Sequence, residues 1–200
     1  MSYVPLAEKM RPKTLDEVVG QAHVLGEGKL LQQLVASGQP FSVIFWGPPG
    51  SGKTTLARIL ASEMKADFIE ISAVTAKKAD VERVVKQAEE NQRLELRTVL
   101  FVDEIHRFNK AQQDAFLPHV ENGLISLIGA TTENPSFEVI TPLLSRSRVI
   151  VLEPLSKEDI ALLLKRAAKA EGIKSKNFPT KSVDLLAEMS GGDARVALGT

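Results

Sequence analysis

The sequence predicts an α/β fold in which helices cover both faces of a five-stranded parallel sheet. Short apolar runs rich in Val, Ile and Phe alternate with longer segments of helical period, which is the pattern of strands joined by crossover helices. The run at 98–102 is apolar without alternation, as expected of a central strand that is covered on both faces. After residue 152 only helical patterns follow. We therefore expect a smaller all-helical domain after the sheet domain.

The periodicity places the individual elements in chain order. We expect strands at 42–46, 67–72, 98–103, 126–130 and 149–152. Between them we expect helices near 54–64, 78–93 and 111–121, and a shorter helical turn around 142–145. Further helices are expected at 157–171, at 180–190 and from residue 193 onward. The change of pattern predicts a core domain over 1–153 and a helical domain over 154–200 that is cut short at its end.

Composition narrows the class of protein. The chain has 200 residues, 44% of them hydrophobic, and its 25 acidic and 25 basic residues cancel, so its overall charge does not indicate a nucleic-acid partner. It has no cysteine, which excludes a disulfide framework, a thiolate metal site and a cysteine nucleophile. The amino-terminal segment lacks the apolar core of a signal peptide, and no later run reaches the length that spans a bilayer. We expect a cytoplasmic protein without membrane contact, of which this chain is the amino-terminal piece.

A phosphate-binding loop is predicted directly after the first strand. The segment GPPGSGKTT at 47–55 has the spacing of that motif and opens a helix. The glycines permit backbone torsions that point successive N–H groups inward, and the helix amino end adds about half a positive charge. Lys53 supplies a full charge near the terminal phosphates of ATP, and the Thr54 hydroxyl is a hard oxygen suited to Mg²⁺. The residues expected to hold the nucleotide are Gly47, Pro48, Pro49, Gly50, Ser51, Gly52, Lys53, Thr54 and Thr55.

Two carboxylates at the end of the predicted central strand supply an independent signal. The segment TVLFVDEI at 98–105 ends in Asp103 and Glu104. Asp103 is expected to bind the magnesium ion, largely through water, because Mg²⁺ keeps much of its hydration shell. Glu104 is expected to polarise the attacking water. A strand that ends in Asp-Glu also occurs as a plain solvated turn, but the glycine loop upstream favours the catalytic interpretation.

Four segments resemble a known family. They are LAEKMRPKTLDEVVGQAHVLGEGK at 6–29, FWGPPGSGKTTLA at 45–57, DEIHRFNKAQQDAFLPHVENG at 103–123 and GATTENPSF at 129–137. Through them the chain resembles the AAA+ ATPases of the clamp-loader clade, and more narrowly the replication-associated recombination protein A family, whose eukaryotic relative is the Werner-helicase-interacting ATPase. The resemblance covers nearly the whole chain and implies a P-loop AAA+ core followed by a partial helical lid.

The resemblance also implies roles for residues outside the two motifs. Thr132 matches the family's first sensor, which contacts the attacking water or the γ-phosphate. Arg146, in LLSRSRVI at 143–150, matches the arginine that relatives insert into the neighbouring subunit's nucleotide, although Ser147 replaces the cysteine found in many of them and Arg148 is a rival assignment. Arg195, in SGGDARVAL at 190–198, matches the second sensor on the lid.

The amino-terminal segment around Arg11 and Pro12 resembles the stretch that lies beside the adenine in this clade, with Val19 and Gln21 as the candidate contacts. An arm that merely packs on the core surface is an alternative interpretation of the same residues.

The resemblance implies work at stalled or gapped replication forks, with stimulation by DNA, the single-strand-binding protein as a partner, nucleoid association and a homo-oligomer formed through a carboxy-terminal region beyond residue 200. Lys77 and Lys78 stand where a nucleic-acid-tracking loop would be basic, although two lysines at a helix start are also typical of solvated surface. The segment SAVTAKKAD at 72–80 lacks the aromatic residue of protein-unfolding rings. Two alternatives stay open: a Holliday-junction branch-migration motor, and a nucleotide-gated binding subunit of the clamp-loader type.

Overall fold

The computed structural model describes residues 4–26, 28–174 and 177–199. Five parallel strands form a single sheet in the order β2-β3-β4-β1-β5. The strands are β1 (Ser42–Trp46), β2 (Asp67–Ser72), β3 (Thr98–Asp103), β4 (Ile125–Thr131) and β5 (Ser147–Val151). The predicted α/β fold and parallel sheet are confirmed. The bounds of β1, β2 and β3 are as predicted, whereas β4 extends one residue beyond each predicted end and β5 begins and ends earlier than expected.

The strand order brings three loops to one edge of the sheet. β4 lies between β1 and β3, with Phe45 of β1 beside Ala130 and Phe101 of β3 beside Ile128. Because all the strands are parallel, the segments that follow β3, β4 and β1 leave the sheet side by side at its carboxyl edge. Ligand sites of open α/β sheets form at this edge.

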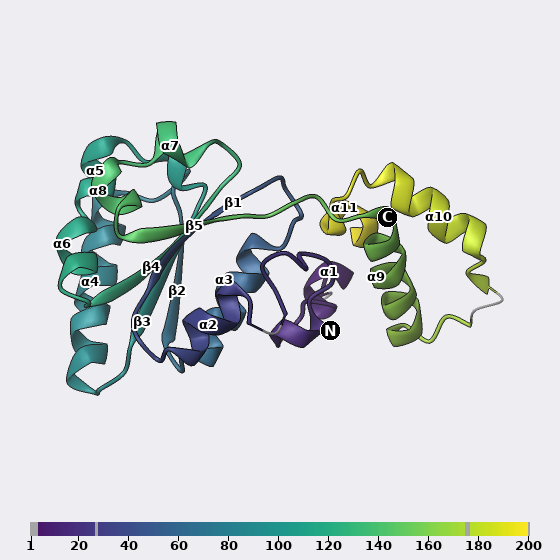
Figure 1. Cartoon of the computed structure of the whole chain (residues 1–200), viewed down its shortest axis with the longest axis horizontal. Helices are drawn as coiled ribbons and strands as arrows, with labels where there is room; N and C mark the ends of the chain where they lie inside the picture. The colour runs from purple at the N-terminus through teal and green to yellow at the C-terminus, as the bar shows by residue number, and fades with distance from the viewer. Residues whose placement is uncertain (1–3, 27, 175–176, 200) are drawn as a thin grey trace.

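Helices cover the two faces of the sheet separately (Figure 1). On one face, α2 (Leu30–Ala36) and α3 (Lys53–Glu63) pack on a buried cluster that includes Val43, Phe45 and Phe101. On the other face, α4 (Lys78–Arg93), α6 (Leu117–Glu121) and α8 (Thr141–Leu144) pack on a second cluster around Ile44 and Leu100. Alternate residues of β1 therefore face opposite helical layers, as the pleat requires.

The helix predicted over 111–121 is wrong in one respect, because the structure has two short helices there, α5 (Lys110–Asp114) and α6. Pro118 lies in the first turn of α6 and has no N–H to donate to the carbonyl of Asp114, so a continuous helix would lose a hydrogen bond at this point. Phe116, between the two helices, is fully buried under the sheet. The break turns its ring into the core.

Five short elements have no counterpart in the predicted list. They are α1 (Leu6–Lys9), η1 (Leu15–Glu17), α2, η2 (Ile105–Arg107) and α7 (Pro135–Glu138). Each is too short for a helical period to emerge from the sequence. The other helices begin and end within one residue of the predicted bounds, α4 matching them at both ends.

The carboxy-terminal part contains α9 (Lys157–Ala170), α10 (Thr180–Met189) and α11 (Ala194–Gly199), which lie away from the sheet with α1 beside α11 (Figure 1). They share a buried cluster with Leu155 and with Val19 of the amino-terminal arm. This cluster contains residues from both sides of the predicted domain boundary at residue 153, so that boundary stays a prediction. No helix in the described ranges has both the length and the apolar character to cross a membrane.

Asn91 ties α4 to the starts of two strands, and we predict that its loss destabilises the fold. Its side-chain amide donates to Asp67 Oδ2 at 2.8 Å and to Thr98 Oγ1 at 2.9 Å, and Asn91 is buried. Asn91→Ala leaves these partners without their donor, which costs about 1–3 kcal/mol. Chemical denaturation measures this loss. The control is Gln92→Ala on the exposed side of the same helix, which should stay within about 0.5 kcal/mol of wild type; equal stability of the two variants would contradict the prediction.

Candidate active site

The loop between β1 and α3 is held in a conformation that only glycine tolerates at two positions. Gly50 has φ 70° and Gly52 has φ 101°, both in the left-handed region. A Cβ on Gly50 would also lie 2.0 Å from Asp193 Oδ1, which is shorter than any non-bonded contact. The Ser51 hydroxyl closes the loop by donating to the Pro48 carbonyl at 2.9 Å. The spacing of this segment therefore has a direct steric reason.

Lys53, the first residue of α3, turns its ammonium group back into this loop. Its Nζ donates to the carbonyls of Gly47 at 2.7 Å and Pro48 at 2.8 Å, and the residue is only 6% exposed. Burial lowers the pKa of Lys53, the Glu104 and Asp103 carboxylates oppose that shift, and Arg195 adds to it. A positive group is thus held at the amino end of α3, where the helix dipole already favours anions.

A cavity of about 280 Å³ opens beside this helix end. Gly50, Ser51, Gly52, Lys53, Thr54 and Thr55 form its polar wall. Its apolar wall includes Met10, Val18, Val19, Leu155, Leu163 and Leu198. Arg195 and Arg11 also line it, and Arg11 Nη1 donates to Thr55 Oγ1 at 3.2 Å. One wall thus suits phosphate oxygens and the other suits a flat apolar ring.

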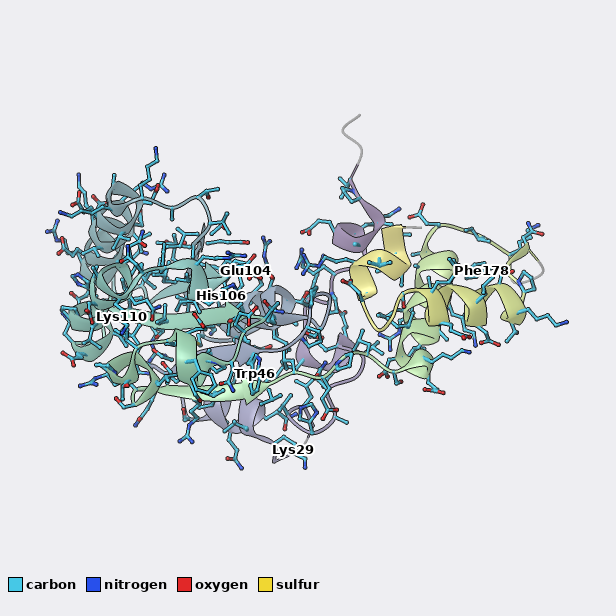
Figure 2. The ribbon with its side chains drawn as sticks, turned by 90° about the horizontal axis from the view of Figure 1, so that it is seen from above. Lys29, Trp46, Glu104, His106, Lys110 and Phe178 are labelled. Atoms are coloured by element: carbon cyan, nitrogen blue, oxygen red, sulfur yellow. The ribbon has the colours of Figure 1, made fainter. Side chains whose placement is uncertain are left out.

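Asp103 ends β3 and Glu104 follows it, at the same edge of the sheet. Glu104 has φ 54° and ψ 46°, a left-handed conformation that costs about 1–3 kcal/mol for residues other than glycine. Its carboxylate Oε2 lies 3.3 Å from His106 Nε2, and Figure 2 shows these two side chains next to each other. The backbone conformation and the histidine together fix the direction of the Glu104 side chain.

Thr132 follows β4, between the glycine loop and the Asp103–Glu104 pair. Its neighbour Thr131 is fully buried and is the end of the strand, with its carbonyl accepting the Gly47 N–H at 3.1 Å. Thr132 itself is half-buried. The expected sensor therefore lies directly after the strand that separates β1 from β3.

The two candidate arginines lie in different surroundings. Arg195 is the second residue of α11 and lines the cavity, with its backbone N–H donating to Asp193 Oδ1 at 2.7 Å. Arg146 follows α8, where its guanidinium bonds to Glu121 Oε1 at 2.6 Å and to the Pro142 carbonyl at 2.9 Å. Arg146 does not line the cavity of its own chain, and its action on a neighbouring subunit stays a prediction.

Val19 and Gln21 were both expected beside the base. Val19 lines the apolar wall of the cavity. Gln21 does not line it: its side chain donates to the Glu153 carbonyl at 2.7 Å and to the Ser51 carbonyl at 3.3 Å, and accepts the Glu153 N–H at 3.0 Å. Gln21 thus joins the arm, the glycine loop and the start of the helical part, and its contact with a base stays a prediction.

Sequence reasoning missed several residues of the site. Asp193 was not singled out, although it packs on Gly50, and neither was Thr131 or Glu121. The apolar wall from α9 and α11 was also missed. The sequence signal for Asp193 is the pair of glycines before it, because adjacent glycines mark a turn. In the structure both glycines have positive φ, and Gly192 lies against Leu155.

Known structures share this fold. The Holliday junction branch migration motor RuvB of Thermotoga maritima aligns with a TM-score of 0.76 and 33% identity over 94% of this chain and 63% of that chain. A mutant of the same protein gives a TM-score of 0.78 and 31% identity over 95% of this chain. The similarity covers both the sheet and the helical part.

Curated relatives are more similar in sequence. Replication-associated recombination protein A of Haemophilus influenzae is 48% identical over 97% of this chain and 44% of its own length. The protein of the same name from Escherichia coli K12 is 48% identical over 100% of this chain and 45% of its own length. ATPase WRNIP1 of Dictyostelium discoideum is 42% identical over 98% of this chain. The chain spans less than half the length of these relatives.

The family model that matches covers the strands and loops that build the site. It spans residues 43–155, from β1 through the glycine loop, Asp103, Glu104 and Arg146 to the start of the helical part. The strand order, the loop that only glycine permits and the paired acids lie within this match. The chain belongs to the ATPase family associated with various cellular activities (AAA).

Proposed function

We propose that the protein is a DNA-dependent ATPase that acts in replication-fork maintenance, recombination and repair, and that it binds and hydrolyses ATP with Mg²⁺. The observation that carries the ATPase proposal is the meeting of the glycine loop, Lys53 and the Asp103–Glu104 pair at one edge of the sheet, beside a cavity with one polar and one apolar wall. The role in replication is supported by 48% identity to the two bacterial proteins over nearly the whole chain.

The residues of this chain divide the work of binding. Amides of the loop and the Lys53 ammonium would hold the phosphates, and the apolar wall with Val19 would cover the base. Arg195 on α11 lines the same cavity and would contact the γ-phosphate, so that α11 responds to the nucleotide. Asp193 packs closely on Gly50, so phosphates that enter the loop would approach its carboxylate. Repulsion between these negative groups supports such a response of α11.

The donors fit a magnesium ion that is shared with the nucleotide. Among the described residues no cluster of His, Cys, Asp or Glu side chains is large enough to hold a metal alone. Thr54 and Asp103 offer hard oxygens, and Mg²⁺ is typically held by one or two such groups together with phosphate oxygens and water. When bound there, the ion would neutralise charge on the β- and γ-phosphates.

Hydrolysis then needs a water in line with the γ-phosphorus. Glu104 would accept a hydrogen bond from that water and orient it, while Thr132 would contact the water or the phosphate from the next strand. The water oxygen bonds to phosphorus as the bond to the bridging oxygen breaks, and the proton that the water loses passes to Glu104, which leaves ADP and inorganic phosphate. Arg146 of a neighbouring subunit would stabilise the charge of the transition state.

We further propose a homo-oligomer in which each Arg146 completes the next site, and a cytoplasmic, nucleoid-associated protein that works with the single-strand-binding protein. The identity to the recombination-associated relatives supports this context. A branch-migration motor is the second candidate, because the RuvB structure aligns over 94% of the chain. An inert binding subunit is disfavoured, since Lys53, Asp103, Glu104 and Arg146 are all present.

Two substitutions separate binding from hydrolysis. Lys53→Ala should abolish ATP binding, because it removes the buried ammonium from the loop. Glu104→Gln should bind ATP normally and lower turnover by about a hundredfold or more. Equilibrium binding of a fluorescent ATP analogue and a phosphate-release assay measure the two effects, with exposed Lys65→Ala as the control. Equal turnover of wild type and Glu104→Gln would contradict the catalytic assignment.

Arg146→Ala should leave ATP affinity unchanged and reduce turnover of the whole protein by about a thousandfold. Arg148→Ala, on the exposed edge strand, is the matched control and should keep turnover near wild type. Mixing the inactive Arg146→Ala and Lys53→Ala proteins should restore part of the activity, because one subunit supplies the site and the other the arginine. Absence of any recovery in mixtures shown to exchange subunits would refute action on a neighbour.

DNA should stimulate the ATPase, and the form of DNA separates the candidates. We expect single-stranded, gapped or forked DNA to stimulate turnover of the whole protein more than a four-way junction at the same salt concentration. Replacing the exposed Lys77 and Lys78 with Ala should weaken DNA binding and reduce the slope of log affinity against log salt by about 0.7 per lost phosphate contact. The control pair is Lys86→Ala with Arg93→Ala, further along α4. Preference for the junction would favour the branch-migration motor.

A further inference from the structure

His106 occupies an unusual position directly behind the proposed catalytic carboxylate. It belongs to the short turn η2, which begins immediately after Glu104, and its side chain is only 8% exposed although histidine is commonly found nearer the surface. The ring lies between the end of β3 and the end of β4, next to Glu104 (Figure 2). The reaction proposed above makes no use of it.

Both ring nitrogens of His106 have partners. Nε2 lies 3.3 Å from Glu104 Oε2, and Nδ1 lies 3.0 Å from Thr131 Oγ1. A neutral imidazole donates through one nitrogen and accepts through the other. A ring that donates to the Glu104 carboxylate through Nε2 must therefore accept the Thr131 hydroxyl proton at Nδ1. When the Thr131 hydroxyl gives its proton to Nδ1, it favours the tautomer that donates to Glu104.

Thr131 is a firm anchor for this ring. The residue is fully buried, its carbonyl accepts the Gly47 N–H at 3.1 Å, and its hydroxyl accepts the Glu133 N–H at 2.9 Å. The hydroxyl also lies 3.1 Å from the Glu133 carbonyl, so that carbonyl and His106 Nδ1 are alternative acceptors for its proton. Any movement of the turn after β4, where Thr132 lies, therefore changes the support of the imidazole.

We propose that His106 is a positioning residue for ATP hydrolysis, which aims the Glu104 carboxylate at the attacking water from an anchor on Thr131. The proposal rests on the proposed role of Glu104 and deepens it. The chain of contacts runs from the glycine loop through Thr131 and His106 to Glu104, so the group that binds phosphate and the group that orients water share a support.

The alternative is that His106 only fills a space in the structure. In that case its loss would lower stability and would affect nucleotide binding and turnover together. A positioning residue has a different effect: its loss lowers kcat and leaves the affinity for ATP unchanged, because the phosphate grip is untouched. Only a positioning role also predicts that kcat depends on whether the substituted side chain can donate to Glu104.

The test compares three replacements of His106 in the whole protein. His106→Ala should lower kcat up to about a hundredfold, since small misplacements of catalytic groups cost this much, with unchanged ATP affinity. Gln places an amide N–H near the position of Nε2, so His106→Gln should recover most of kcat. Asn places its amide near Nδ1, so His106→Asn should bond to Thr131 but not to Glu104 and should recover little. His119→Ala, a half-buried histidine on α6, is the matched control and should retain wild-type kcat.

Two further variants make the outcome decisive. Thr131→Val removes the anchoring hydroxyl and should lower kcat in the same direction, whereas Thr131→Ser keeps the hydroxyl and should not. Wild-type kcat in folded His106→Ala, or equal loss in the Ala and Gln variants together with a lowered Tm, would overturn the proposal. If Glu104→Gln itself turned over normally, the proposed function would fail first, so the two failures are distinguishable.

Discussion

The buried ammonium of Lys53 lies at the centre of the site, enclosed by carbonyls of its own loop. Burial lowers its pKa, while the Glu104 and Asp103 carboxylates work against that shift. The Lys53 Nζ beside the amino end of α3 donates to two neutral carbonyls, and carbonyl oxygens are poorer partners for an ammonium group than phosphate oxygens. Phosphate binding can then replace two neutral acceptors by charged ones. The loop, the paired acids and Asp193, which packs on Gly50, all surround the place where this exchange would occur.

The sheet supplies the rigidity that this exchange needs. β4 lies between the strand that carries the glycine loop and the strand that carries the acids, and its last residue contacts both sides through the Gly47 N–H and the His106 ring. The helical part joins at the same place, because Gln21 ties the loop to Glu153 and Asp193 packs against Gly50. If the loop binds phosphate and Glu104 orients water as proposed, phosphate occupancy, water orientation and the position of α11 would be linked through these few groups.

The fold and the centre of the site were predictable because their signals are local. An apolar run followed by glycines and Lys53 specifies a strand, a loop and a helix start together, and the bounds of β1 and α4 emerged from periodicity alone. The contacts of Asp193 with Gly50 and of Arg146 with Glu121 depend on packing between distant segments, which no local pattern encodes. The same holds for Thr131 and His106, which meet across two strands. The broken helix at Phe116 combines the missing N–H of Pro118 with tertiary packing that buries the Phe116 ring.

A crystal structure of the protein with Mg²⁺ and a non-hydrolysable ATP analogue tests the central claim most directly. The account predicts that the triphosphate lies at the amino end of α3 and that Lys53 Nζ leaves the carbonyls of Gly47 and Pro48 for phosphate oxygens. It also predicts the base against the apolar wall that includes Val19. A loop that stays closed on Lys53, with the analogue absent or bound elsewhere at saturating concentration, would contradict the account.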